Sequence, residues 1–519
     1  MPLKLLTLVI SLLYTTCLYS QLTYSNIYRV DSSSLMRTHF GRMLVTDSCY
    51  YVTGTQRHID SSSSAIDGIL SKLDTNGNII WSKSYRDSSQ RIDLKWRNII
   101  STNQGNLVTV GSDNNGLGYF LLLDTDGEVI TKKSYHSGDS TDRLILATIA
   151  QDEDNNFYLF GAYVHSNNWK SILIKTDSVG NEIWRKYFVV LPYTGTINLS
   201  TGHFIISIEN NEFVLVVTTN KNGINSWDYE TGTRLIKIDS AGNILNQYQT
   251  PTNNRWISAY FVKQTIDKGF IFYSTEAANR TSTNVANSFR YYGYIGKIDS
   301  SFQLVWEKRY GRVRSYFGAA QEKANGEILV AGTYLTDYPP DSAQYSGWLM
   351  ALDENGDSLW SRKYHRIFDR AYILHEIYDM EILPNGDILM LGTIDNNRVA
   401  AGTDFGEWGW LIRTDSFGCI VPNCQLLDNT EDIAVFFDNE VTVYPNPVSD
   451  VMRFRFEKPL QDAVIRVYSG LGQLVGQTAL PLPQTDAEIN VSDWNSGVYF
   501  YGLYIDGRIV HQGQFLVQH

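Results

Sequence analysis

A short pattern recurs along most of the chain at long and nearly regular intervals. It is an apolar residue followed, directly or one residue later, by Asp-x-x-Gly, and its aspartates are Asp74, Asp124, Asp177, Asp239, Asp353 and Asp415. A degenerate copy at Asp299 has Phe302 in place of the glycine. Successive aspartates are 50, 53, 62, 60, 54 and 62 residues apart. A period of this length is that of a sheet-forming repeat rather than of a helical solenoid.

Each copy predicts four antiparallel strands and shows no clear helical periodicity. Asn325-Gly326 and Asn385-Gly386 lie between apolar runs and predict tight type I′ turns, in which both central residues adopt positive φ. A third strand ends at the repeat aspartate. The fourth often carries Trp at +7 and Tyr at +11 from it, residues expected to pack within the protein. The sequence therefore predicts an all-β fold, a seven-bladed β-propeller over residues 22–424.

The two ends of the array predict how the ring closes. Pro422 stands where the last copy would continue into its fourth strand, whereas residues 22–30 alternate between apolar and polar and precede the first copy. We expect this N-terminal segment to supply the missing strand, because closure removes an edge that would otherwise pair with other chains. Cys419 and Cys424 are predicted to form a disulfide beside the closure, and Cys49 to be buried as a thiol.

The N-terminal residues 1–20 predict a secretory signal peptide. Lys4 precedes an apolar run over residues 5–13, and cleavage is expected after Ser20. Cys17 raises the alternative of a lipoprotein, but the residues before it lack the small side chain expected there. No later apolar run is long enough to cross a bilayer as a helix. The net charge of −12 is spread along the chain, which argues against nucleic acid as a partner.

The composition changes after Cys424. Residues 425–440 contain no glycine and predict a linker, and residues 441–519 predict a small β-sandwich of alternating strands and Gly, Pro or Asn turns. Within this last segment the motif residues are Tyr444, Pro445, Asn446, Pro447, Gly472, Gly497, Tyr499 and Gly513. Their order and spacing resemble the type A C-terminal sorting domain of type IX secretion substrates. An unrelated adhesive sandwich is the alternative.

The resemblance implies a Gram-negative, diderm source and a defined export route. Such chains pass through the periplasm, and the outer-membrane translocon recognises the sorting domain as a partner. The domain is then usually removed, and the cargo stays at the cell surface or enters the medium. This chain ends in His519 where many members end in lysine, so anchoring and release both stay open.

The predicted propeller places its long connections on one face, opposite the tight turns. They cover residues 56–67, 221–232, 275–293, 335–347 and 394–406. Loops on a rigid scaffold are where binding residues concentrate, so we expect a glycan or protein ligand on this loop face. Aromatic and arginine side chains suited to such ligands are Trp227, Tyr229, Arg290, Tyr291, Tyr292, Tyr338, Tyr345 and Trp408. The alternative is that these aromatics pack between blades.

Catalytic and metal-binding patterns are weak. Asp124-Thr-Asp126-Gly-Glu128 resembles the start of a calcium loop but lacks the late carboxylate, so the repeat aspartates are expected to cap turns. No His-Glu-x-x-His or Gly-x-Ser-x-Gly motif occurs, and we predict no metal and no cofactor. Acids that blades might bring together for glycoside cleavage are Asp60, Asp228, Glu230, Asp337, Asp341 and Glu407.

The favoured interpretation is a non-catalytic binding protein at the cell surface or in the medium. The rival interpretations are an extracellular polysaccharide hydrolase or lyase that uses the same face, and a structural component of the cell surface. Fold alone does not separate them, because propellers host all three.

Overall fold

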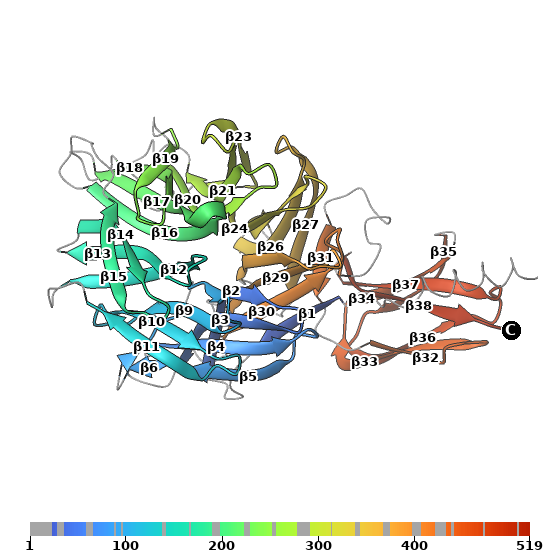
Figure 1. Cartoon of the computed structure of the whole chain (residues 1–519). Helices are drawn as coiled ribbons and strands as arrows, with labels where there is room; N and C mark the ends of the chain where they lie inside the picture. Colours follow the sequence, from blue (N-terminus) through green and yellow to red (C-terminus); the bar gives the residue numbers. More distant parts are fainter. Residues whose placement is uncertain are drawn as a thin grey trace, which may run out of the picture. The chain divides into compact units, whose positions relative to one another are not determined.

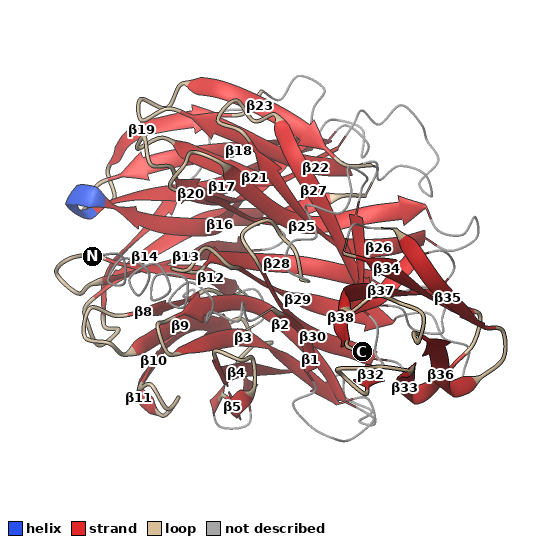
Figure 2. Cartoon of the chain, turned by 90° about the vertical axis from the view of Figure 1, so that its right-hand side faces the viewer, coloured by secondary structure: helices blue, strands red, loops and turns tan. Residues whose placement is uncertain are grey.

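Nearly all regular structure in the computed structural model is β (Figure 2). Among the described residues, the helical element is the short 3-10 helix η1 (Glu209–Asn211). The chain divides into two units, Met1–Ser361 with Ala371–Thr430, and Arg362–Arg370 with Glu431–His519. The structure describes residues 23–28, 36–58, 66–87, 90–94, 97–136, 142–165, 168–188, 198–222, 229–251, 256–277, 291–312, 314–337, 343–366, 374–396, 406–420, 432–436, 441–470, 473–505 and 508–519.

Strands of the first unit follow one another in antiparallel sets of four. In these sets the chain order of the strands is also their order in the sheet. The first three sets are β2 (Met36–Val45), β3 (Cys49–His58), β4 (Ile66–Asp74) and β5 (Ile79–Ser84); β8 (Ile99–Ser101), β9 (Leu107–Ser112), β10 (Gly118–Leu123) and β11 (Val129–Tyr135); and β12 (Arg143–Gln151), β13 (Phe157–His165), β14 (Asn168–Thr176) and β15 (Glu182–Phe188). A two-stranded ribbon, β6 (Arg86–Asp87) and β7 (Gln90–Arg91), follows the first set.

Further sets follow, and the last of them is completed from the N-terminus. They are β16 (Asn198–Ile208), β17 (Glu212–Asn222), β18 (Tyr229–Ile238) and β19 (Ile244–Gln249); β20 (Trp256–Gln264), β21 (Phe270–Ala277), β22 (Tyr291–Ile298) and β23 (Leu304–Tyr310); and β24 (Tyr316–Glu322), β25 (Ile328–Asp337), β26 (Ala343–Leu352) and β27 (Ser358–Arg366). Beyond them β28 (Leu374–Ile382), β29 (Ile388–Asn396) and β30 (Gly406–Thr414) are joined by β1 (Tyr24–Tyr28). Four-stranded sheets in this sequence are those of a β-propeller.

The repeat aspartates cap the turn between the third and fourth strands. Asp74 Oδ1 accepts hydrogen bonds from the backbone N–H groups of Asn76 (2.9 Å) and Asn78 (2.7 Å). The glycine of the motif adopts the left-handed conformation, with φ of +82° at Gly77. In the degenerate copy Phe302 takes the same conformation with φ of +65°, and its ring is buried 5.3 Å from that of Phe270. Burial of the ring offsets the backbone cost of a non-glycine residue there.

The Asn-Gly turns differ from the type I′ turns predicted for them. Glu322 pairs with Ile328, so the loop between β24 and β25 contains five residues rather than two. The N–H of Gly326 donates to Lys323 O at 2.9 Å, and Gly326 has φ of +84° whereas Asn325 is not left-handed. The loop is a turn followed by a left-handed glycine. This is a common hairpin connection among those longer than two residues. The prediction of a hairpin was right, and the predicted turn type was wrong.

In several sets a tyrosine of the fourth strand bonds the turn of the next set. Tyr85 Oη donates to Gly127 O at 2.9 Å, and Tyr135 Oη donates to Gly180 O at 2.7 Å. Trp81 lies against the same turn, where a Cβ on Gly127 would be 2.6 Å from its ring. The expectation that these Trp and Tyr residues pack within the protein is confirmed at these positions.

The N-terminal strand occupies the predicted fourth position of the last set. β1 pairs antiparallel with β30 in the register Tyr24↔Arg413 to Tyr28↔Gly409. Tyr28 therefore corresponds to the tyrosine of the other fourth strands, and its Oη donates to Gly77 O of the first set at 2.5 Å. The prediction that residues 22–30 fill this place is confirmed for the described part, Tyr24–Tyr28.

The sets form a closed circle. Their first strands contact one another in the order β2, β8, β12, β16, β20, β24, β28 and back to β2. Colours in Figure 1 run through the unit in the same order, and β29 and β30 lie near β1 and β2. A buried apolar cluster with Phe40, Val52, Leu389 and Leu411 fills the space between the last and first sets. The ends of the array are thus joined by a hydrophobic core as well as by β1.

Arg42 of β2 crosses the middle of this circle. Its Nη1 donates to the carbonyl oxygens of Tyr378 (2.7 Å) and Gly318 (3.3 Å) and lies 3.5 Å from Asp379 Oδ1. The guanidinium carbon also lies 4.0 Å from the ring centroid of Phe261. One side chain of the first set therefore bonds to strands β24 and β28 and stacks on β20.

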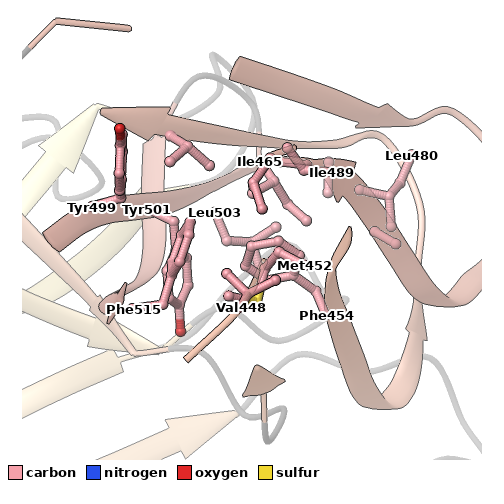
Figure 3. Close-up of a cluster of buried hydrophobic side chains, with 14 of the residues drawn as sticks. Val448, Met452, Phe454, Ile465, Leu480, Ile489, Tyr499, Tyr501, Leu503 and Phe515 are labelled. Carbon is pink, nitrogen blue, oxygen red and sulfur yellow. The ribbon is translucent and has the colours of Figure 1, made fainter. Parts of the chain in front are cut away.

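The second unit contains two sheets that pack around one core (Figure 3). Met452 and Phe454 from one sheet meet Ile465, Tyr501 and Phe515 from the other. The predicted β-sandwich is confirmed. The sheets contain β32 (Val441–Tyr444), β33 (Val451–Leu460) and β36 (Gln484–Asn490), and β35 (Leu474–Leu480), β34 (Ala463–Ser469), β37 (Gly497–Ile505) and β38 (Arg508–Val517).

The stretch predicted as a linker, residues 425–440, contains one further strand of the second unit. This strand, β31 (Asp432–Phe436), pairs in parallel with Arg362–Arg366 of β27. The predicted linker therefore includes a segment of regular structure.

If β1 closes the ring, Tyr28→Phe and Tyr85→Phe should lower the free energy of unfolding by equal amounts. Tyr28→Phe removes the hydroxyl that bonds Gly77 O, and Tyr85→Phe removes its counterpart at an internal boundary. Each change is expected to lower the free energy of unfolding by about 1 kcal/mol, the net value of one buried hydrogen bond. Denaturant unfolding of the purified variants measures both. A neutral Tyr28→Phe beside a costly Tyr85→Phe would contradict closure through β1.

Arg42→Met is expected to lower the free energy of unfolding by about 3 kcal/mol. The change removes the cation beside the partly buried Asp379 and the donor to the carbonyl oxygens of Gly318 and Tyr378. The matched control is Arg143→Met at an exposed position of β12, which is expected to change stability by less than about 0.5 kcal/mol. Equal losses in the two variants would show that Arg42 has no special role.

Candidate functional site

The loop face of the first unit carries the ends of the second and third strands of each set. Only the ends of the long connections belong to the described residues. Trp227, Arg290 and Tyr338 lie outside them, and of Tyr229 only the backbone is described, as the start of β18. The predicted residues that remain are Tyr291, Tyr292, Tyr345 and Trp408.

Arg314 joins two of the predicted tyrosines. Its backbone N–H donates to Tyr291 O at 2.6 Å, and its Nη1 donates to Tyr345 Oη at 3.4 Å. His375 Nδ1 in turn donates to Tyr345 O at 2.9 Å. Arg314 itself is exposed, whereas Tyr345 is only 7% exposed. The contacts hold a solvent-facing guanidinium between β22 and β26, and sequence reasoning missed this arginine because it lies outside the long loops.

The other two predicted aromatics differ in their surroundings. Tyr292 is partly exposed, with the Arg309 guanidinium carbon 5.6 Å from its ring centroid. Trp408 on β30 is only 7% exposed, so most of its ring packs inside the protein. Tyr291, Tyr292 and Arg314 therefore offer more surface to a ligand than Tyr345 and Trp408 do.

A second group of polar side chains lies on the first strands β2, β24 and β28 and on the third strand β30, and we call it the channel cluster: His39, Tyr316, Glu376, Tyr378 and Glu407. Glu376 Oε1 accepts a hydrogen bond from Tyr316 Oη at 2.7 Å, and its Oε2 accepts one from Tyr378 Oη. His39 Nδ1 lies 2.5 Å from Glu407 Oε1. Burial, reinforced by the nearby Glu376 carboxylate, raises the pKa of both tyrosines well above the usual value.

The chemistry of the channel cluster follows from these partners. Each glutamate is already paired inside the protein, Glu376 with two phenols and Glu407 with an imidazole. Tyrosines with raised pKa values stay protonated and serve as hydrogen-bond donors. Of the acids considered for glycoside cleavage, only Glu407 has a described side chain, and the cluster places it beside a histidine.

His203 and Tyr260 are the bulge residues of two neighbouring first strands, β16 and β20. The register shifts between Gly202 and Phe204 in β16, and between Ala259 and Phe261 in β20. Their rings lie 4.5 Å apart, and His203 Nε2 lies 2.6 Å from Thr218 Oγ1. Burial lowers the pKa of His203 to about 4.

The repeat carboxylates and the cysteines are accounted for by local structure. Asp124 Oδ1 accepts the N–H groups of Asp126 (2.9 Å) and Glu128 (2.8 Å), as a turn-capping residue does. In the part of the chain that the structure describes, no group of three or more His, Cys, Asp or Glu side chains is placed to hold a metal ion. Cys49 is a buried free thiol, and Cys419 is disulfide-bonded. Cys424 lies outside the described residues, so the pairing stays a prediction.

The sorting motif connects the start of the second unit to its last strand. Asn446 Oδ1 accepts the N–H of Leu516 at 2.9 Å, and the N–H of Val448 donates to Leu516 O at 2.8 Å. Tyr499 Oη donates to Asn495 O at 2.9 Å. A Cβ on Gly513 would lie 2.7 Å from Tyr501 Oη, so a larger residue there would require the Tyr501 ring to move. Gly472 lies outside the described residues.

Comparison with protein families identifies the second unit. Residues 442–517 match the family model of the secretion system C-terminal sorting domain. The chain carries a type IX sorting domain. The resemblance seen in the sequence is thus confirmed, and the sorting domain marks a protein exported to the cell surface or the extracellular space. In the described residues no helix is both long and apolar enough to span a membrane.

Solved structures similar to the chain share little sequence with it. A protein of unknown function from Bacteroides caccae has 10% identity over 61% of this chain and 92% of its own, with a TM-score of 0.33. The β-propeller domain of the Trilobed protease from Pyrococcus furiosus has 8% identity over 76% and 99%, with a TM-score of 0.39. Extracellular domains 1–2 of Drosophila Semaphorin 1a have 9% identity over 73% and 86%, with a TM-score of 0.37. No curated protein matches the chain.

His203 predicts a pH-dependent component of stability. Its pKa is about 4 in the folded protein and about 6.5 when unfolded, so the unfolded state binds more protons between these values. Its contribution is therefore complete above pH 6.5 and declines as the pH falls toward 4. Denaturant unfolding at pH 7.5 and 5 should show a larger loss for the wild type than for His203→Gln. Equal losses would mean that His203 titrates normally in the folded state.

Proposed function

We propose that this exported propeller is a non-catalytic binding protein whose loop face holds a glycan. The observation that carries the proposal is that the partly exposed Tyr291 and Tyr292 and the exposed Arg314 all lie on that face. An arginine held by a backbone and a side-chain contact can donate to a carboxylate or hydroxyl group of a glycan, and a partly exposed tyrosine ring can stack on a sugar ring. A site of arginine and tyrosine side chains can hold a glycan without cleaving it, because it needs no nucleophile and no pair of acids.

The delivery route belongs to the same proposal. Residues 1–20 act as a signal peptide, the chain crosses the periplasm of a Gram-negative cell, and the type IX translocon recognises the sorting domain. The mature propeller of residues 22–424 then has seven blades, the sets described above, with the last closed by β1. The contacts between the first strands of successive sets, from β2 through β28 and back to β2, support this count.

The state of the carboxylates favours binding over hydrolysis. Glycosidases use two carboxyl groups that face a substrate across roughly 5 to 10 Å, one of them as acid. Here Glu376 and Glu407 are each bonded to side chains of the channel cluster. If either carboxylate left these bonds to act on a substrate, its buried donors would lose their partners. Each such loss costs about 1 to 3 kcal/mol.

Binding by the full secreted protein to a panel of polysaccharides, followed by calorimetry with a ligand that it retains, tests the proposal. The double variant Tyr291→Ala/Arg314→Gln is expected to weaken binding by at least tenfold, because it removes a stacking ring and a charged donor. The matched control on the turn face is Phe417→Ala/Lys268→Gln, an exposed ring and an exposed cation. The control is expected to bind as the wild type does.

Three results would contradict the proposal. New reducing ends or unsaturated products in the mixtures would establish an enzyme. Equal weakening in both double variants would remove the loop face as the site. Retention of no polysaccharide, together with a stoichiometric assembly with other surface proteins, would favour the structural role.

A further inference from the structure

The first strands of the sets carry a β-bulge at a repeated position. One residue there has no partner in the second strand, and these residues are Gly41, Ala147, His203, Tyr260, Gly318 and Tyr378. The extra residue of a bulge leaves the ladder and re-aims its side chain. The rings of His203 and Tyr260 come from different sets and lie 4.5 Å apart. The bulge positions therefore lie side by side around the centre of the propeller.

Arg97 occupies the bulge position of the second set. It lies five residues before Thr102, whose carbonyl oxygen accepts the turn bond of that set. Ala147 lies five residues before its counterpart Asp152 in the third set. An arginine therefore stands in the central ring of side chains, at a position that other sets fill with glycine or alanine.

The guanidinium of Arg97 has few partners. Its Nε is buried and, among the described residues, has no hydrogen-bond partner. No carboxylate of those residues forms an ion pair with it. Burial lowers the pKa of Arg97 below its usual value, and the Asp93 carboxylate, which acts in the opposite direction, offsets only part of that shift. The charge is therefore only partly balanced, and a buried donor without an acceptor is costly.

The neighbouring bulge positions supply no acceptor. Gly41 of the first set and Ala147 of the third have no polar side-chain atom. Arg97 and Ala147 both stay partly exposed although they belong to the innermost part of their sets. The centre of the ring is therefore accessible to water and to small solutes beside Arg97.

A second group without a partner lies on the neighbouring first strand. Thr148 of β12 is fully buried, and its Oγ1 has no hydrogen-bond partner in the described part of the chain. Asn98, which follows Arg97, donates through Nδ2 to Ile149 O at 3.0 Å and accepts the N–H of Ile149 at 2.8 Å. These two bonds join the strands directly beside Arg97 and Thr148.

Arg42 brings a further donor to the same place. Thr53 Oγ1 lies within hydrogen-bond distance of Arg42 O (3.3 Å) and of Arg97 O (2.7 Å), so the two backbones meet. Arg42 Nη1 is engaged with Asp379 and two carbonyl oxygens. Its Nε, however, is buried and has no hydrogen-bond partner within the described ranges. Three buried donors on adjacent strands thus share the need for an acceptor.

We propose that a small inorganic anion of the size of chloride binds in the centre of the ring beside Arg97. The Nε groups of Arg97 and Arg42 and the hydroxyl of Thr148 donate to it. Its charge balances the part of the Arg97 charge that Asp93 leaves. A carboxylate of a loop-face ligand is disfavoured, because Ala147, the counterpart of Arg97, stands in the middle of β12 and not at its loop end. The site does not depend on the function proposed for the loop face.

Thermal unfolding of the full secreted protein in sodium chloride and in sodium gluconate of equal ionic strength tests the proposal. Gluconate is too large for the site, and its salt screens surface charges to the same extent. An anion that binds only the folded state stabilises it. The midpoint gained on replacing gluconate by chloride should therefore be about 2 °C larger in the wild type than in Arg97→Met. The matched control is Arg143→Met, which removes an exposed arginine of β12 and should keep the wild-type gain.

Thr148→Val provides an independent test that leaves every charge in place and holds even if Arg97→Met does not fold. The hydroxyl has no partner among the described residues, so the variant should be as stable as the wild type in gluconate. Its gain in chloride should be less than half that of the wild type. A full wild-type gain in this variant would contradict the proposal.

Bromide locates the anion directly. Crystals of the full secreted protein soaked in sodium bromide should show anomalous scattering in contact with the Arg97 guanidinium. Bromide at surface positions alone would overturn the proposal and mean an adventitious ion only. Equal chloride gains in the wild type and Arg97→Met, or an equal loss of the gain in Arg143→Met, would overturn it as well. None of these experiments changes Tyr291 or Arg314, so a failure here is distinguishable from a failure of the loop-face proposal.

Discussion

Each four-stranded set of this protein is too small to bury its own faces, and the rest of the structure follows from that constraint. A single small sheet of this kind gains stability only when apolar side chains from the neighbouring sheets cover it. Consecutive sets therefore stack, and the first and last must also meet. The cluster with Phe40 and Leu411, the pairing of β1 with β30 and the guanidinium of Arg42 make this last contact.

The same constraint places the candidate sites. The strands alternate in direction, and their tight turns are capped by the repeat aspartates and bonded by tyrosines of the preceding set. These contacts hold the turn face rigid and leave the opposite face for longer connections. Phe188 and Thr250 stand at the +11 position after Asp177 and Asp239, so this tyrosine is missing at two boundaries between sets. The tyrosine bond therefore recurs at several boundaries between sets but is not required at all of them.

Local patterns in the sequence predicted much of the fold. The Asp-x-x-Gly spacing predicted the sets, and the alternation of residues 22–30 predicted β1, because both depend on residues near each other in the chain. The turn type at Asn325-Gly326 was not predictable in this way, since the length of the loop depends on the register of the flanking strands. The sorting domain was recognisable because its motifs occur in a fixed order.

The candidate sites were less predictable, since they depend on contacts between distant segments. Arg42 bonds Tyr378, which lies 336 residues away, and no local pattern distinguishes that arginine from an exposed one. Glu376 and the two tyrosines that bond it were missed for the same reason. Phe188 is different, because its departure from the +11 tyrosine is visible in the sequence.

Hydrogen–deuterium exchange of the secreted protein tests the closed ring most directly. If β1 is the fourth strand of the last set, amides of Tyr24–Tyr28 that bond β30 will exchange as slowly as those of β5 and β11, the corresponding strands inside the array. Exchange of this N-terminal segment within seconds, while β5 and β11 stay protected, would show that the ring is not closed through β1.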